Sequence, residues 1–172
     1  MSGADAVLIR EERAGDADAI TTVTRSAFAE AEHTSGTEAL IIQALRAAGQ
    51  LTVSLVAELD GNVIGHVAIS PVRISDGAPC WYGLGPVSVL PTHQGLGIGS
   101  QLIRASLERL RASATHGCVV LGEPAYYSRF GFSTHPQLVL PGVPAEYFQA
   151  MSFSGPMPAG TVEYHEAFGV SE

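Results

Sequence analysis

A single stretch, Val87 to Leu110, most constrains how this chain can fold and what it can bind. It begins with apolar residues typical of a strand, passes through a proline, and then has glycines at the alternate positions 95, 97 and 99. Apolar residues then recur at helical spacing, which predicts an amphipathic helix with one face on a core. Glycines permit positive φ and close backbone approach, and a helix N-terminus offers unpaired N–H groups and partial positive charge. The stretch therefore predicts a seat for a phosphate or pyrophosphate group.

Other interpretations of the glycines can be weighed from the residues around them. A tight turn that happens to be rich in glycine would give the same letters, so the motif alone is weak evidence. A Walker A loop is excluded because the chain contains no lysine. A nucleotide-binding redox domain would need a third glycine where Leu102 stands, and the late position of the loop in the chain also disfavours it.

The loop and a second motif downstream resemble the GNAT N-acetyltransferase superfamily. Gln94-x-x-Gly97-x-Gly99 is similar to the Gln/Arg-x-x-Gly-x-Gly/Ala loop with which that superfamily binds acyl-CoA. The segment 87–91 resembles its fourth strand and the exit from that strand. Residues 127–132 resemble its Tyr-x-Lys/Arg-x-Gly-Phe motif. Two motifs in the expected order, separated by one helix and one strand, are much more specific than either alone.

The resemblance implies a mixed α/β fold: a central, mostly antiparallel twisted sheet with a splayed strand pair and flanking helices. The length predicts one domain over residues 1–172, and the resemblance ends near Phe132, so 133–172 are expected to add strands and loops. Gly83, Gly85 and Pro86 interrupt the strand before the loop and predict a bulge, because proline cannot donate to the ladder. In GNAT proteins such a bulge helps to open the gap that the pantetheine arm enters; an ordinary edge irregularity is the alternative.

The remaining elements follow from hydrophobic period and turn residues. Strands are predicted over 7–10, 51–59, 63–74, 81–90, 118–121, 137–140, 148–153 and 161–168. One helix is predicted from the cap Asp16 to Phe28, and a second from the cap Thr37 to the closing Gly49. A third is predicted from Ile98 to His116–Gly117, and a short one from Tyr126 to Phe130, stopped by Gly131. A loop is expected over 30–36.

By the resemblance, acetyl-CoA is the co-substrate that supplies the acyl group. Backbone groups of Val87 and Val89 would pair with the pantetheine amides, and an N–H near Val89 would polarise the thioester carbonyl. The loop amides and Ser100 would hold the pyrophosphate. The expected cofactor-binding residues are Val87, Ser88, Val89, Gln94, Gly95, Leu96, Gly97, Ile98, Gly99 and Ser100.

Tyr127 stands where the superfamily's motif places its general acid, and a phenol with a pKa of ~10 can donate a proton to a departing thiolate. The alternative is that Tyr127 only packs, as a tyrosine on a short helix commonly does. Its neighbour Tyr126 is expected to pack. Many members carry a carboxylate on the fourth strand as the base, but Leu-Gly-Pro at 84–86 holds none, so that residue cannot be carried over.

Glu123 is the second candidate catalytic residue, because it ends a predicted strand at the mouth of the expected cleft. It could deprotonate an amine through water or bind its cation, or it could cap the helix that follows. His33 and His66 are further candidates, although a lone histidine is more often structural. Many such enzymes need no single base, because a fraction of the amine is neutral at working pH.

Composition narrows the partners. The formal net charge is −8 and every basic residue is arginine, a balance that makes nucleic acid an unfavourable partner and is compatible with a cationic amine. The apolar runs are too short for a membrane span and no signal peptide is visible, so we expect a cytoplasmic protein. Cys80 and Cys118 lack metal-ligand spacing, so no metal is expected, and Cys118 should be buried. A homodimer is possible by analogy with such folds.

These observations lead to one hypothesis and one rival. The hypothesis is an N-acetyltransferase that transfers the acetyl group of acetyl-CoA directly to an amine, on a small molecule or a protein, with Tyr127 as the general acid. The rival is a non-catalytic acyl-CoA-binding or sensing domain. The missing fourth-strand carboxylate favours the rival, and Tyr127 speaks against it.

Overall fold

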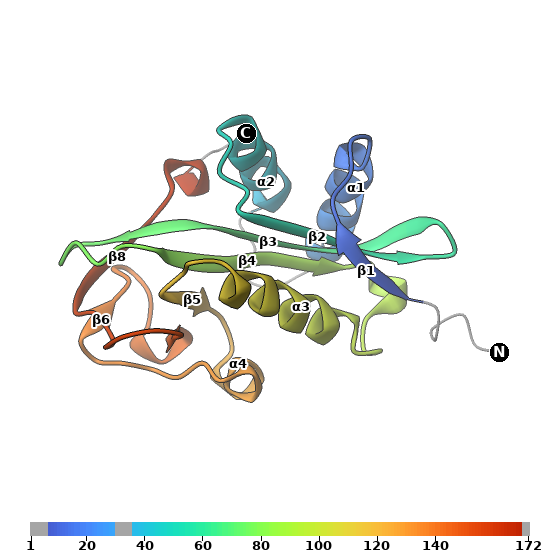
Figure 1. The fold of residues 1–172 in the computed structure, drawn as a ribbon. Coiled ribbons are helices and arrows are strands. Elements are labelled where there is room, and N and C mark those ends of the chain that lie inside the picture. The colour runs from blue at the N-terminus through green and yellow to red at the C-terminus, as the bar shows by residue number, and fades with distance from the viewer. Residues whose placement is uncertain (1–6, 30–35, 170–172) are drawn as a thin grey trace.

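The computed structural model describes residues 7–29 and 36–169, and places eight strands in a twisted sheet with helices on both faces (Figure 1). The strand order is β1-β2-β3-β4-β5-β7, with β8 beside the end of β3 and β6 beside β8. The strands are β1 Leu8–Glu11, β2 Val53–Leu59, β3 Asn62–Ile74, β4 Trp81–Val89, β5 Gly117–Leu121, β6 Leu138–Val139, β7 Phe148–Ser152 and β8 Gly160–Tyr164. The helices are α1 Ala17–Phe28, α2 Glu38–Ala47, α3 Ile98–Ala112 and α4 Pro124–Tyr127.

The first four strands form an antiparallel meander, as the sequence predicts. β2 turns into β3 through Asp60 and Gly61, whose φ angles of 52° and 81° are the positive values that a two-residue hairpin requires. β4 and β5 run parallel with α3 between them in the chain, and β5 pairs antiparallel with β7. The mixed, mostly antiparallel sheet that the resemblance implied is confirmed.

β4 has a bulge relative to β3, at the place where its pairing with β5 ends. Val67 of β3 is opposite Val87, but Ile69 is opposite Leu84, so β4 has one more residue than β3 between the two pairs. The extra length falls at Gly85–Pro86, where proline offers no N–H to the ladder. β4 pairs with β5 only up to Leu84. The predicted bulge and the predicted splay of these strands are therefore both present.

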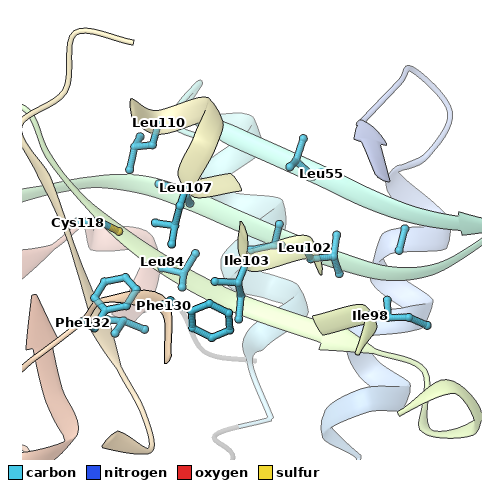
Figure 2. Packing of buried hydrophobic residues seen from close by; sticks show 14 of the residues in the cluster. Leu55, Leu84, Ile98, Leu102, Ile103, Leu107, Leu110, Cys118, Phe130 and Phe132 are labelled. Atoms are coloured by element: carbon cyan, nitrogen blue, oxygen red, sulfur yellow. The ribbon is translucent and has the colours of Figure 1, made fainter. Parts of the chain in front are cut away.

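α3 covers one face of the sheet with the apolar stripe that the sequence predicts. The buried members of this stripe are Ile98, Leu102, Ile103, Leu107 and Leu110. Figure 2 shows them together with Leu55 and Leu84 of the sheet, and with Phe130 and Phe132 near Leu84 at one end of the cluster. Burying each such side chain contributes about 1.5–3 kcal/mol. This packing fixes the N-terminus of α3 against the end of β4.

α1 and α2 cover the opposite face (Figure 1). Ile20 and Ile42 pack on Val56 of β2, whereas its neighbours Leu55 and Ala57 belong to the cluster under α3. This alternation is the period of two expected for a strand buried on both faces. Neither predicted N-cap residue caps its helix through its side chain. Asp16 and Thr37 precede the helices, but neither side chain makes a capping hydrogen bond.

Asp16 has a different partner. Its carboxylate accepts hydrogen bonds from the guanidinium of Arg10 and the backbone N–H of Arg13. The second carboxylate on Arg10 is Glu58 of β2, at 2.8 Å. Arg10 therefore ties the start of α1 to the first two strands, which local sequence cannot reveal.

α3 is shorter than predicted. It ends at Ala112 rather than at His116–Gly117, and Gly117 is the first residue of β5. A Cβ at Gly117 would overlap the ring of Trp81 and the carbonyl of Met151, so the glycine serves sheet packing and not helix termination. No helix in the described part of the chain is long and apolar enough to cross a bilayer.

The segment after Phe132 completes the sheet. Strands occur in all three predicted places, but the last one ends at Tyr164 rather than at Phe168. The ring Nδ1 of His165 accepts the backbone N–H of Ala167, and the chain turns into a 3₁₀ turn over Glu166–Gly169. The rings of Tyr164 and Phe168 then meet edge to face, with centroids 4.9 Å apart.

Candidate functional site

The glycine loop before α3 has the predicted backbone conformation. Gly95 and Gly97 have φ angles of 79° and 83°, and Gly97 is the N-cap residue of α3. A Cβ at either position would meet no other atom within 4 Å, so conformation rather than packing requires the glycines. The first N–H groups of α3 have no partner inside the helix, and the helix dipole adds partial positive charge there. The loop therefore presents donors suited to an anion.

A cleft of about 360 Å³ lies at this loop, and we refer to it as the loop cleft. Its lining residues are Val89, His93, Gln94, Gly95, Gly97, Ile98, Gly99, Ser100, Tyr126 and Arg129. The sequence did not single out His93, Tyr126 or Arg129 for this role. The Arg129 guanidinium lies 4.7 Å from the centroid of the Tyr126 ring and brings a cation to the cleft. The signal that could have revealed Arg129 is its place at the Lys/Arg position of the downstream motif.

Among the predicted cofactor residues, Leu96 and Ser88 do not line the loop cleft, whereas Gln94 lines it and also has a structural partner. Leu96 is 56% exposed and does not line the cleft. The side-chain amide of Gln94 donates to the carbonyl of Val89 at 3.0 Å, so it holds the end of β4 against the loop. Ser88 is buried on the α1 side, where its hydroxyl lies 3.3 Å from the hydroxyl of Thr24. The side chain of Ser88 therefore lines neither this cleft nor the cavity described next.

A second hollow, of about 500 Å³, lies where β4 leaves β5, and we call it the gap cavity. It is lined by Phe28, Glu38, Ile41, Leu84, Gly85, Pro86, Val87, Leu121, Tyr127, Leu140, Tyr164 and Phe168. These residues come from α1, α2, β4, β5, α4 and the C-terminal segment. The adjacent residues Tyr126 and Tyr127 line the loop cleft and the gap cavity respectively, so α4 contributes to both hollows.

Tyr127 is held firmly at the wall of the gap cavity. Its ring makes edge-to-face contacts with Tyr126 and Phe132, at centroid distances of 5.1 and 6.1 Å. Gly122 allows this position, because a Cβ there would overlap the Tyr127 ring. Burial, reinforced by the neighbouring Tyr126, raises the pKa of Tyr127 to about 12. The hydroxyl is therefore protonated near neutral pH and able to donate a proton.

Tyr164 also lines the gap cavity. Its ring lies against Gly83 of β4, where a Cβ would stand 2.8 Å from the ring edge. The buried hydroxyl has no hydrogen-bond partner among residues 7–29 and 36–169, and burial raises its pKa. A buried hydroxyl without a partner costs free energy, so this atom is suited to a bound molecule or water.

Of the carboxylates of Glu38 and Glu123, only that of Glu38 belongs to a residue that lines the gap cavity. Glu123 is exposed at the end of β5; its backbone carbonyl accepts the N–H groups of Tyr126 and Tyr127, but its side chain makes no capping hydrogen bond. Glu123 does not line the gap cavity, whereas Glu38, at the first turn of α2, does. No local pattern in the sequence distinguishes Glu38, because its position depends on how α2 packs.

Of the histidine candidates, His66 is fully buried in β3 and belongs to neither hollow. Its Nε2 lies 2.8 Å from the hydroxyl of Ser54, which donates to Glu12 at 2.6 Å, and Arg46 pairs with Glu12 at 2.9 Å. Burial lowers the pKa of His66 to about 4. His66 is thus a neutral member of a structural polar chain. His33 lies outside the described residues.

Known proteins resemble this chain along most of its length. Residues 17–132 match the model of the Acetyltransferase (GNAT) family. An N-acetyltransferase of Escherichia coli K12, YhbS, is 38% identical over 170 residues, which cover 94% of this chain and 98% of YhbS.

Two solved structures share the fold closely. A GNAT acetyltransferase from Brucella melitensis, in complex with acetyl-CoA, has a TM-score of 0.85 and 49% identity over 94% of this chain and 97% of its own. Escherichia coli YhbS, in complex with CoA, has a TM-score of 0.86 and 37% identity over 95% of this chain and 92% of its own. The family match includes the glycine loop at the start of α3, the two solved structures share the fold, and the chain belongs to the GNAT family of acetyltransferases.

Proposed function

We propose that this protein transfers the acetyl group of acetyl-CoA directly to an amine, with Tyr127 as the general acid. The observation that carries the proposal is the arrangement of the two hollows. The loop cleft offers anion donors at one end of the part of β4 that does not pair with β5, and the gap cavity has a protonated phenol at the other end. The relatives from Brucella melitensis and Escherichia coli, solved with acetyl-CoA and CoA, support this choice of co-substrate.

The loop cleft fits the pyrophosphate of acetyl-CoA. The positive φ angles of Gly95 and Gly97 turn backbone amides toward the cleft, and no Cβ obstructs the approach. The amides of Ile98, Gly99 and Ser100 are the free donors of the first turn of α3. Arg129, exposed at the rim, adds a positive charge. Anion binding here depends on the backbone, with one side-chain cation to strengthen it.

The part of β4 that does not pair with β5 fits the pantetheine arm. Beyond Leu84 the strand has no pairing with β5, so the backbone groups of Val87 and Val89 on that side are available to amides of a ligand. An extended arm that pairs with a strand edge gains main-chain hydrogen bonds in a fixed register. An N–H near Val89 is the group we propose for polarising the thioester carbonyl. Such positioning can supply about 7–11 kcal/mol of the barrier.

The chemistry requires little else from the protein. Acetyl-CoA supplies an acetyl group on a thioester; the neutral amine nitrogen forms the new C–N bond as the C–S bond breaks, and the amine's surplus proton leaves to water. Tyr127 donates its proton to the departing sulfur and regains one from solvent. A well-placed general acid contributes about 10²–10⁴-fold in rate. The raised pKa of Tyr127 keeps the donor protonated across the working range.

Glu123 has a secondary role in this proposal. Its exposed carboxylate at the end of β5 accepts the amine's proton through water. Because a fraction of any amine is neutral near its own pKa, the reaction does not depend on this single residue. The Glu123→Gln variant should therefore retain most of its activity.

The test measures both the binding of acetyl-CoA and the rate of acetyl transfer. Calorimetric titration should show acetyl-CoA binding to the wild type, and an amine panel should release free CoA thiol. The Tyr127→Phe variant should bind acetyl-CoA as the wild type does but lose about 10²-fold in kcat. Tyr147→Phe, at an exposed tyrosine outside both hollows, is the matched control. Equal kcat in Tyr127→Phe and the control would refute the assignment of the general acid.

A further inference from the structure

The hydroxyl of Tyr164 is a polar atom that the fold leaves without a partner. In the described part of the chain, three buried side-chain atoms make no hydrogen bond: the hydroxyl of Tyr164, the hydroxyl of Ser70 and Nδ1 of His66. Of these three residues, only Tyr164 lines the gap cavity, and none lines the loop cleft. Because a buried unpaired hydroxyl costs stability, its place beside a cavity points to a bound molecule that completes its hydrogen bonding.

The ring of Tyr164 is fixed in a space that the sheet leaves for it. It lies against Gly83 of β4, which has no side chain to obstruct it, and it meets the ring of Phe168 edge to face. Gly122, just after β5, leaves space for the ring of Tyr127 in the same way. Tyr127 and Tyr164 carry the two hydroxyls among the described residues that line the gap cavity. The cavity therefore has two fixed phenols, and the proposed acetyl transfer uses only one of them.

The position of Tyr164 along β4 associates it with the acceptor rather than with CoA. In the proposed function, the pantetheine arm follows β4 beyond Leu84, and Tyr127 donates a proton to the sulfur. Gly83, against which Tyr164 packs, precedes Leu84 and belongs to the part of β4 that pairs with β5. The Tyr164 ring thus lies outside the segment proposed for the pantetheine arm, and the acceptor is the molecule that can complete its hydrogen bonding.

The chemistry of the hydroxyl narrows the group that it can recognise. Burial raises the pKa of Tyr164, so the hydroxyl stays protonated and offers a neutral O–H donor. A hydrogen bond from this donor to the attacking nitrogen would occupy the lone pair that must form the new C–N bond. An oxygen elsewhere on the acceptor can accept the hydrogen bond without this conflict.

The charge of the lining favours an uncharged oxygen over a carboxylate. The chain has no lysine, and none of its arginines is among the described residues that line the gap cavity. A carboxylate on the acceptor would therefore leave water without gaining a positive partner there, which is costly.

We infer that Tyr164 is a recognition residue for the acceptor, and that the acceptor is an amine that also carries an uncharged oxygen, as a hydroxyl or a carboxamide. The Tyr164 hydroxyl donates a hydrogen bond to that oxygen, and the amine nitrogen stays free to attack the thioester. No bond is made or broken at Tyr164, so its contribution is to acceptor binding. This inference rests on the proposed function and specifies its acceptor.

The first experiment removes the hydroxyl and keeps the ring. With the best acceptor of an amine panel, Tyr164→Phe should raise KM for the amine by about threefold to tenfold, with kcat and acetyl-CoA affinity nearly unchanged. Ser70→Ala is the matched control, because it removes another buried hydroxyl without a partner from a residue that lines neither hollow. An unchanged KM in Tyr164→Phe, or an equal rise in Ser70→Ala, would overturn the inference.

The stability of the same variant distinguishes recognition from a structural role. Because the hydroxyl has no partner in the described chain, the urea midpoint of Tyr164→Phe should equal or exceed that of the wild type. A lower midpoint, or a failure to fold, would show that the hydroxyl supports the structure and would overturn the inference.

The second experiment compares acceptors that share one apolar body, with CoA thiol release as the readout. 2-Phenylethylamine has no oxygen, phenylalaninol adds a hydroxyl, phenylalaninamide adds a carboxamide and phenylalanine adds a carboxylate. In the wild type, kcat/KM for phenylalaninol or phenylalaninamide should exceed the values for the other two amines. The ratio to 2-phenylethylamine should fall by about threefold to tenfold in Tyr164→Phe, and comparing ratios between proteins cancels differences in amine basicity.

The outcomes separate this inference from the proposed function. An equal ratio in the two proteins, or a wild-type preference for 2-phenylethylamine or phenylalanine, would overturn the recognition of an uncharged oxygen and leave acetyl transfer intact. If acetyl-CoA does not bind, or no amine releases thiol, the proposed function itself fails.

Discussion

The loop cleft and the gap cavity each have one tyrosine of α4 in their lining, but they are built in different ways. The loop cleft is formed largely by one continuous segment, Val89 to Ser100, and its donors are backbone amides fixed by two left-handed glycines. The gap cavity is assembled from α1, α2, β4, β5, α4 and the C-terminal segment, and its character comes from side chains. The backbone site suits the part of the reaction that stays constant, the CoA pyrophosphate. The side-chain site suits the part that varies between enzymes, the acceptor.

The largest effect should come from breaking the loop cleft. Gly97→Glu places a β-carbon at a φ of 83° and a carboxylate at the proposed pyrophosphate seat, so acetyl-CoA affinity should fall by about a hundredfold or more. Gly49→Glu is the control, because Gly49 also has positive φ, 70°, with open space around it, but follows α2. Titration calorimetry measures both. Comparable loss of affinity in the two variants would mean that the effect is general destabilisation.

A methyl group added at a glycine beside the gap cavity should disturb packing, whereas the glycines of the loop cleft have open space around them. In Gly83→Ala the new methyl would stand 2.8 Å from the Tyr164 ring and 3.1 Å from Val72, and overpacking of this kind costs about 1–3 kcal/mol of stability. Urea denaturation measures that loss. Gly169→Ala, where a methyl meets nothing within 4 Å, should be nearly neutral. Acetyl-CoA affinity in folded Gly83→Ala should match the wild type; a large loss would show that the two sites are not separable.

A smaller effect is expected from the one side-chain cation of the loop cleft. Arg129→Gln should weaken acetyl-CoA binding by about 0.5–1 kcal/mol, because the guanidinium is exposed and screened, and the deficit should shrink at high salt. Arg104→Gln is a close control: Arg104 also stacks on a ring, that of Phe130 at 4.9 Å, but does not line the cleft. Equal affinities in the two variants would remove Arg129 from the site.

The smallest effect concerns pH. An acid acts in its protonated form, which is present below its pKa, and burial raises the pKa of Tyr127 to about 12. At saturating amine, kcat should therefore change less than about twofold on the alkaline side up to roughly pH 10, where a tyrosine with an ordinary pKa would be about half ionised. Stopped-assay rates across this range, on protein shown to stay folded, provide the measurement. An alkaline fall centred on the ordinary tyrosine value would contradict burial of the hydroxyl.

The same contrast explains how much could be predicted from sequence. The loop, the bulge at Gly85–Pro86 and the helix after the loop depend on local conformational rules, and the structure confirms them. Tyr127 was predicted as the general acid only through a resemblance to a family motif. Its raised pKa depends on burial, which the neighbouring residues in the sequence do not encode. Glu38 was not predicted to line the site.

The wrong predictions at the start of α1 and at the end of α3 have a common physical cause. Asp16 was expected to cap α1 because acidic residues commonly do, but Arg10 from β1 competes for its carboxylate. Gly117 was expected to end α3 because glycine commonly does, but it begins β5, where the Trp81 ring needs its missing side chain. In each case a partner distant in sequence or on another element decided the outcome. Local propensity places an element more reliably than it assigns a side chain's partner.

The most direct test of the account is the structure of this protein with CoA bound. It should place the pyrophosphate on the amides of Gly97 to Ser100, the pantetheine along β4 beyond Leu84, and the sulfur within hydrogen-bonding distance of the Tyr127 hydroxyl. The sulfur would then lie at the gap cavity, which Glu38 also lines. A pyrophosphate seated elsewhere, or a sulfur out of reach of Tyr127, would contradict the central claim that the two hollows form one active site.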